Sequence, residues 1–324
     1  MVPGESSGAA ANPLHWFSEL KTADRAALSA MPPDEAQAAV NAILQPRLWQ
    51  TSPSQGPAWK CELDEAEGGI EVMESFALAD LAAVFRALDA AGWDAILVGG
   101  QAVNLWAVHY EQDLPAWHEL RPFTSRDLDY YGGLAEARLA MRVLHASGQL
   151  NTSLDPGPNA GVLKVPLAAG SELLLDVLTG VYGVRTAELE RMAVTCSGSG
   201  PLADLRLRVI HPLLLLEGKA ASLRGLPQDG RQDAKHLRIL VLVVREWLRQ
   251  QLGRPRAVFR IVERLAADAA TRDGLHAFAL GIDLFGAVPL DDLRAARGFA
   301  MFLGRRLPQL QEELAQSRQR HREA

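Results

Sequence analysis

The chain has 324 residues, of which 48% are hydrophobic, so it can bury a substantial core and is not disordered as a whole. Its formal net charge of -6 argues against a broad nucleic-acid-binding surface, although a local basic patch is compatible with that value. Two cysteines, Cys61 and Cys196, exclude a disulfide framework and a zinc knuckle. Met1–Asn12 lacks the pattern of a signal peptide, and the apolar runs are too short to cross a bilayer. We therefore expect a soluble cytoplasmic protein, and the richness in Ala, Arg and Gly is typical of a GC-rich bacterial genome.

The first part of the chain predicts a short helical extension. Two helices are expected over Leu14–Leu28 and Asp34–Leu44, with Met31-Pro32-Pro33 between them. The composition of Thr51–Pro57 is that of a linker. These features predict an N-terminal helical extension and linker over residues 1–58.

From residue 75 onward, predicted helices and strands alternate. Ala77–Ala90 is amphipathic at helical spacing, and Gly92 follows where helices commonly end. The further expected helices are 101–108 and 134–147, and the expected strands are 94–98, 126–131, 162–167, 172–178, 192–195 and 205–210. This alternation predicts a core domain over 59–210, built on one mixed sheet flanked by helices.

After His211-Pro212 the sequence is almost purely helical. The expected helices are 213–223, 231–252, 256–270, 275–284 and 290–315. They predict a helical C-terminal domain over 211–324. The fold class is therefore α/β (α+β), with a mixed sheet, a C-terminal helical bundle and the short N-terminal extension.

Gly99 and Gly100 join an expected strand to an expected helix. Residues without Cβ allow a close turn, and the start of the helix presents backbone N–H groups with partial positive charge, which can hold phosphate. A Gly-Gly pair on its own is more typical of a tight turn, so the phosphate hypothesis depends on the residues that follow.

Asp127 and Asp129 are the strongest functional signal. Side chains alternate along a strand, so both carboxylates lie on one face and Leu128 lies on the other. Two hard oxygen ligands at this spacing suit Mg²⁺ or Mn²⁺. The alternative is an exposed acidic edge, which would not require the hydrophobic residues around the two acids.

Asp176 lies within the apolar run Leu173–Leu178, which predicts a buried strand. Such a carboxylate either belongs to a site or pairs with a cation. As a third acid it could hold the metal or take a proton from an attacking hydroxyl. The alternative is that Asp176 caps the turn at Thr179-Gly180.

Gly99-Gly100, then Ser125-Arg126-Asp127-Leu128-Asp129, then Asp176 together resemble the signature of the DNA polymerase beta-like nucleotidyltransferases. The resemblance covers about residues 77–245 and is closest to the abortive-infection nucleotidyltransferase toxins. It implies that Gly99, Gly100 and Ser125 bind the nucleotide. It also implies that Asp127, Asp129 and Asp176 form a catalytic triad that holds Mg²⁺ (or Mn²⁺).

The toxin-like relatives also carry a lysine on the helix after the sheet and a basic stretch with an aspartate on the next helix. Lys219 and Arg231–His236 stand at those places. Lys219 is either a ligand of the triphosphate or a side chain that extends its amine to solvent at a helix end. The gap between Gly100 and Asp127 is longer than in compact relatives, which makes 111–124 an insertion that either shapes a substrate pocket or is a plain loop.

The sequence therefore predicts an enzyme, a metal-dependent nucleotidyltransferase that moves a nucleoside monophosphate from a nucleoside triphosphate to a hydroxyl acceptor. The acceptor could be a tRNA, a protein or a small molecule, and the resemblance suggests a toxin or phage-defence component with an antitoxin partner and no membrane contact. One alternative is an Asp-x-Asp glycosyltransferase, which the glycine pair and Asp176 fit less well. Another is a non-catalytic binding or regulatory module with the same fold.

Overall fold

The computed structural model describes residues 74–151, 157–167, 170–198 and 200–323. The predicted N-terminal helices and linker lie outside these ranges. Within them the chain forms one seven-stranded mixed sheet with strand order β3-β4-β5-β2-β1-β7-β6. Its strands are β1 (Ile96–Val98), β2 (Asp127–Tyr131), β3 (Ser147–Leu150), β4 (Asn159–Pro166), β5 (Glu172–Leu178), β6 (Val194–Ser197) and β7 (Arg206–Val209). The predicted mixed α/β fold class is confirmed.

The central strands fix which residues share a face of the sheet. β2 runs antiparallel to β1 and parallel to β5, with Val98 opposite Asp129 and Asp129 opposite Asp176. Directly paired residues project to the same face, and the face alternates at each residue. The other face of β2 carries the fully buried Leu128 and Tyr130. One face of the central sheet is therefore apolar core, and the opposite face carries the acids.

Five helices belong to the part of the chain that forms the sheet. They are α4 (Ala82–Ala90), α5 (Gly99–Tyr110), α6 (Pro115–His118), α7 (Leu134–Val143) and α8 (Thr186–Met192). α5 follows β1 without a connecting loop, packs against β1 and β2, and is buried around most of its circumference. A helix that is apolar on nearly all sides forms only where neighbouring elements surround it.

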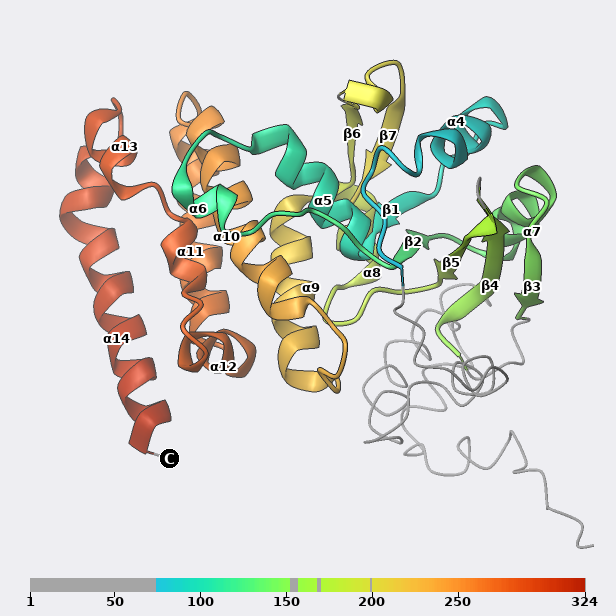
Figure 1. Cartoon of the computed structure of the whole chain (residues 1–324). Helices are drawn as coiled ribbons and strands as arrows, with labels where there is room; N and C mark the ends of the chain where they lie inside the picture. The colour runs from blue at the N-terminus through green and yellow to red at the C-terminus, as the bar shows by residue number, and fades with distance from the viewer. Residues whose placement is uncertain (1–73, 152–156, 168–169, 199, 324) are drawn as a thin grey trace, which may run out of the picture. The chain divides into compact units, whose positions relative to one another are not determined.

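The helices after residue 211 pack side by side, as the sequence predicts. They are α9 (Pro212–Gly225), α10 (Asp233–Gln250), α11 (Pro255–Ala270), α12 (Arg272–Ala279), α13 (Leu290–Ala295) and α14 (Leu307–Glu323). α9 and α10 pack against each other and against α5, which joins them to the sheet. Figure 1 shows β3–β5 at the right, α5 and α9 near the centre, and α11–α14 at the left.

Several elements differ from the prediction, and one of them is the short α6, which lies where only a loop was expected. The helix expected to reach Ser147 ends at Val143, and the missed strand β3 begins at Ser147. His145 takes a left-handed conformation with φ of 50°, which lets the N–H of Ala146 bond to the carbonyl of Met141 and close the helix. Glycine usually fills that position, so the sequence carried no stop signal.

Two further differences are a missed helix and a broken one. α8 occupies Thr186–Met192, where no helix was expected, and β6 follows it near the strand expected at 192–195. The single helix expected over 290–315 is interrupted: α13 ends at Ala295, and Gly298 has φ of +88°. A π-helical segment (Phe302–Arg306) then leads into α14.

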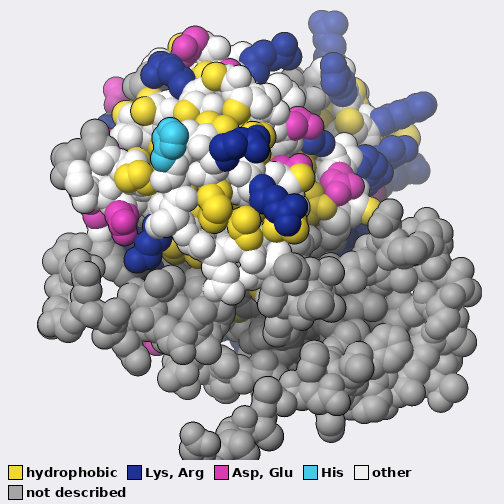
Figure 2. Space-filling model, turned by 90° about the vertical axis from the view of Figure 1, so that its right-hand side faces the viewer, with side chains coloured by type: hydrophobic (Ala, Val, Ile, Leu, Met, Phe, Trp, Pro, Cys, Tyr) yellow, Lys and Arg dark blue, Asp and Glu magenta, His cyan; other side chains and the backbone are white. Residues whose placement is uncertain are grey.

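The described surface carries mixed charge. Figure 2, which faces the end of the sheet with β3 and α7, shows Lys and Arg interspersed with Asp and Glu on the part that is not grey. Such a face agrees with the net charge of -6, which argues against broad nucleic-acid binding. No helix in the described ranges is both long and apolar enough to cross a membrane.

Candidate functional site

Gly99 opens α5 in a conformation that favours glycine. Its φ is +64°, and an added Cβ would lie 1.8 Å from Oδ2 of Asp129. Any side chain there would overlap the carboxylate and be strained in the left-handed region. The absence of a side chain at residue 99 is therefore what lets Asp129 lie against the start of the helix.

Gly100 permits a second close approach, from different residues. An added Cβ would lie 2.2 Å from Oγ of Ser125 and 3.2 Å from Cε1 of His236. The two glycines thus bring the backbone of α5 against Asp129 on one side and against Ser125 and His236 on the other. A tight turn that accommodates neighbouring side chains accounts for both glycines by itself, so phosphate binding by Gly99 and Gly100 stays a prediction.

The structure brings the three predicted acids to one face of the sheet. Asp129 and Asp176 are register partners on the parallel strands β2 and β5, and Asp127 precedes Asp129 by two residues. Asp127 and Asp129 are half-buried, and Asp176 is 6% exposed. We call Asp127, Asp129 and Asp176 the acidic face.

The acidic face has the right chemistry for a hard divalent cation but does not form a ready set of three ligands. Carboxylate oxygens are the ligands that Mg²⁺ and Mn²⁺ prefer. Yet across the described residues no three His, Cys, Asp or Glu side chains are grouped so that they could hold one metal ion. Oδ1 of Asp127 instead accepts a hydrogen bond of 3.0 Å from Oγ of Ser125. Joint coordination by all three acids would need their side chains to reorient, so the metal stays a prediction.

Ser125 links the glycine turn to the acidic face. It is buried, and its backbone N–H and carbonyl both pair with Phe76. The buried Gln101 of α5 donates to the carbonyls of Phe76 at 3.0 Å and Ser125 at 3.3 Å. These bonds fix the segment that leads into β2, and nucleotide binding by Ser125 stays a prediction.

Lys219 lies in a buried ion-pair network. Its Nζ is 2.8 Å from Oδ1 of Asp233, whose side chain is 1% exposed, and Nε of Arg231 is 2.6 Å from Oδ2 of Asp233. Burial raises the pKa of Asp233, but the charges of Lys219 and Arg231 and their hydrogen bonds outweigh it and bring the pKa down to about 2. We call Lys219, Arg231, Asp233 and Lys235 the charge cluster.

His236 is a residue that the sequence analysis did not assign to the site. Its side chain is 4% exposed, and neither ring nitrogen has a hydrogen-bond partner in the described structure. Burial lowers the pKa of His236 well below its ordinary value, and the positive charges of Lys219, Lys235 and Arg231 lower it further against the opposing charge of Asp233. Its stretch, Arg231–His236, matches a basic segment of the toxin-like relatives, but the histidine itself predicts only a surface or core residue.

The predicted insertion is a packed segment. It contains α6, whose Trp117 is 1% exposed and meets Phe123 edge to face. Nζ of Lys235 donates to the carbonyl of Pro122 at 2.6 Å, and Arg126 donates to the carbonyl of Gly230 at 2.5 Å. The insertion and the segment after it are therefore anchored beside the charge cluster.

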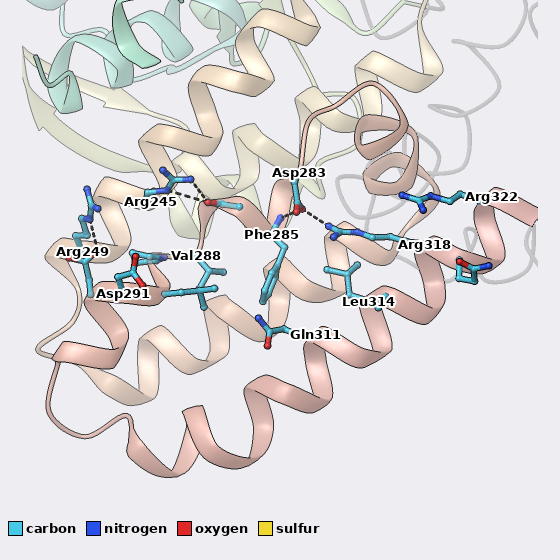
Figure 3. A pocket seen from close by; sticks show the side chains of 16 residues that line it. Arg245, Arg249, Asp283, Phe285, Val288, Asp291, Gln311, Leu314, Arg318 and Arg322 are labelled. Atoms are coloured by element: carbon cyan, nitrogen blue, oxygen red, sulfur yellow. Dashed lines mark hydrogen bonds and ion pairs between the residues drawn. The ribbon is translucent and has the colours of Figure 1, made fainter. Parts of the chain in front are cut away.

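A cavity of about 790 Å³ lies in the C-terminal helical part, away from the acidic face. Figure 3 shows Arg245 and Arg249 entering it from α10 and Gln311, Leu314 and Arg318 from α14. Three of the guanidinium groups that line it are bonded to the protein: Arg245 to the carbonyl of Gly286, Arg249 to Asp292 and Arg318 to Asp283. We therefore assign the candidate chemistry to the start of α5.

Comparison with known proteins adds no assignment. The chain matches no protein-family model, and no curated protein is similar to it in sequence.

Proposed function

We propose that the protein is a metal-dependent nucleotidyltransferase, which transfers a nucleoside monophosphate from a nucleoside triphosphate to a hydroxyl acceptor. The observation that carries the proposal is the register pairing of Asp129 with Asp176, on the face where Asp129 also lies against Gly99. Like charges directly opposite each other in a sheet are destabilising. A cation that binds there offsets this cost. The pairing of the two aspartates is therefore better explained by a role in binding a cation than by a contribution to stability.

In this proposal the acidic face holds the cation and helps to activate the acceptor. Asp127 and Asp129 would hold Mg²⁺ or Mn²⁺, which would supply positive charge to offset that of the triphosphate. Asp176, beside the pair, completes the ligand set and orients the acceptor hydroxyl or takes its proton. The residues of this chain thus contribute position and charge, which are the main contributions of a protein to phosphoryl transfer.

The nucleotide phosphates would bind between the acidic face and the charge cluster. The first N–H groups of α5 have no partner within the helix and carry partial positive charge. Lys219 is bonded to Asp233, but an ammonium group has three donors, so the pairing leaves donors for a phosphate oxygen. The proposal includes a cytoplasmic location. It leaves open whether the acceptor is a tRNA, a protein or a small molecule, and whether an antitoxin controls the enzyme.

A non-catalytic binding module is the second candidate. It is favoured by the lack of a three-ligand metal group among the described residues. Under this alternative the protein binds a nucleotide without turning it over.

One experiment separates the candidates. The full chain is incubated with each α-labelled nucleoside triphosphate, Mg²⁺ or Mn²⁺, and total bacterial RNA and protein, while pyrophosphate release is followed. Label on an acceptor together with pyrophosphate release is expected. If calorimetry shows triphosphate binding but neither a labelled acceptor nor pyrophosphate forms, the protein is a binding module. Transfer from labelled nucleotide-sugars alone would favour a glycosyltransferase.

A further inference from the structure

His236 is a buried polar side chain whose ring nitrogens bond to no described residue. It lies on α10, is 4% exposed, and has both ring nitrogens without a hydrogen-bond partner in the described structure. Buried polar groups are normally bonded, and leaving one unbonded is costly. Such a group in a folded protein calls for a specific reason, and a ligand is one that can be tested.

The ring of His236 is aimed at the start of α5. Its Cε1, the carbon between the two nitrogens, lies 3.2 Å from the position that a Cβ of Gly100 would occupy. Gly100 is the second residue of α5, whose first N–H groups lack partners within the helix. Both unbonded nitrogens therefore flank the atom that faces the part of α5 where an anion is favoured.

The charges around His236 favour an anion over a cation. Among the described residues that act on it, Lys219, Arg231 and Lys235 are positive and only Asp233 is negative. These charges and burial keep the imidazole neutral, with one N–H donor. A metal ligand set is disfavoured, since no group of three His, Cys, Asp or Glu suited to a metal occurs in the described residues.

We propose that His236 is a phosphate-binding residue, which donates a hydrogen bond from a ring nitrogen to an oxygen of the nucleotide's phosphate chain at the start of α5. The inference rests on the proposed function, because it takes the nucleotide to bind where Gly99 and Gly100 begin the helix. It adds a specific contact from α10 that neither the glycine turn nor Lys219 supplies.

The test uses magnesium tripolyphosphate, which carries the phosphate chain without a base, and isothermal titration calorimetry of the full chain. His236→Phe keeps a ring of similar shape but removes both nitrogens, whereas His236→Gln keeps an amide donor. We expect His236→Phe to weaken binding about 10-fold or more, as for the loss of a hydrogen bond to a charged group, and His236→Gln to recover part of the loss.

His211 provides the matched control. It is also buried and held neutral, with a pKa lowered by burial to about 4, but its Nδ1 accepts from the N–H of Leu213. His211→Gln is expected to lower the melting temperature and to leave the affinity for tripolyphosphate unchanged. A drop in affinity equal to that of His236→Phe would show a general packing effect and overturn the proposal.

The remaining outcomes separate this inference from the proposed function. If the wild type binds tripolyphosphate and folded His236→Phe binds equally well, the role of His236 is overturned and the proposed function stands. If the wild type binds no triphosphate, both proposals fall. Should His236→Phe not fold, ¹⁵N spectra decide: the imidazole signal that is absent in His236→Gln must shift when tripolyphosphate is added to the wild type, and an unmoved signal overturns the proposal.

Discussion

The two glycines that begin α5 have different surroundings, which lead to two sets of charged residues of opposite construction. Gly99 contacts the acidic face, through Asp129. Gly100 contacts His236, which lies within the electrostatic influence of the charge cluster. One set gathers like charges on a sheet, and the other mixes three cations with one anion.

This difference separates a structural network from a candidate site. In the charge cluster Asp233 is held by Lys219 and Arg231, and its pKa of about 2 records that the pairing favours the folded state. The register pairing of Asp129 with Asp176 has the opposite electrostatic sign, because two carboxylates side by side repel. The acidic face is thus the region where removing a charge should cost more activity than stability.

The largest effect is expected from the acidic face. Asp127→Ala and Asp129→Ala should each reduce nucleotide transfer by about 10³-fold or more, since charge stabilisation in an active site commonly contributes that much. Their melting temperatures should fall only slightly, because relief of repulsion between like charges offsets part of the lost contacts, such as the hydrogen bond from Ser125 to Asp127. Label transfer and thermal unfolding of the purified variants measure both.

Asp94 supplies the control for those variants. It is exposed and pairs with Arg208 at 3.1 Å, at the edge of the same core. Asp94→Ala should leave transfer unchanged, because exposed ion pairs contribute little. Undiminished transfer by Asp127→Ala or Asp129→Ala would refute the metal assignment.

A smaller loss is expected when the glycine turn is changed. Gly99→Ala places a Cβ 1.8 Å from Oδ2 of Asp129, so the carboxylate must move, and a shift of about 1 Å can cost about 100-fold in rate. Gly92 is the matched control, because its φ is +75° and nothing lies within 4 Å of its Cβ position. Gly92→Ala carries the same kind of backbone strain, about 1 kcal/mol, without displacing Asp129.

The comparison of these two alanine variants in transfer assays isolates the contact with Asp129. Both should lose stability, and only Gly99→Ala should lose activity. Equal activity in the two variants would mean that the position of Asp129 does not matter for the reaction.

Much of the fold could be predicted because the strongest local signals agreed with the tertiary structure. The apolar run at Glu172–Leu178 predicts a strand with the same bounds as β5, and Gly99-Gly100 marks the junction of β1 and α5. The end of α7 could not be predicted, because His145 adopts a left-handed conformation that its residue type rarely takes. Tertiary packing determines where α7 ends, and no local sequence pattern indicates that position.

The site shows the same division between local and non-local information. Alternation along a strand predicts that Asp127 and Asp129 share a face, and the register with β5 is consistent with it. That β5 is the neighbour of β2, with Asp176 opposite Asp129, depends on strand order, which the sequence does not encode locally. His236 could not be assigned because its proximity to Gly100 joins helices more than 100 residues apart in the chain.

A more modest effect on activity is expected from the charge cluster. Asp233→Asn removes the partner of Lys219 and Arg231 and should reduce transfer about 10-fold, as expected when a binding side chain loses its position.

The same variant tests the lowered pKa of Asp233. The folded pKa of about 2 lies below the ordinary value of about 4, so Asp233 stabilises the fold above about pH 4, and this stability is lost as the pH falls toward about 2.

Urea unfolding of the wild type and Asp233→Asn at several pH values checks this direction of the change in stability with pH. The difference in unfolding free energy between the two proteins should be constant above about pH 5 and shrink by about 2 kcal/mol toward about pH 2. A difference that stays constant through this range would show that Asp233 is not held by the two cations.

The smallest effect on activity is expected at a carboxylate cluster away from the start of α5, which tests whether buried charge alone marks a site. Arg264 bonds to Glu217 at 2.5 Å and to Glu188 at 3.0 Å, and burial together with the charge of Glu217 raises the pKa of Asp268 to about 8. A raised carboxyl pKa gives stability that is complete below about pH 4 and is lost as the pH rises toward about 8. Asp268→Asn replaces the protonated carboxyl with an amide that stays neutral at every pH. As the pH rises through this window, the melting temperature of the wild type should fall and that of the variant should not. At any one pH the two proteins should transfer nucleotide at the same rate. A loss of transfer in the folded variant would mean that charge density, and not the geometry around Gly99 and Gly100, is what the reaction requires.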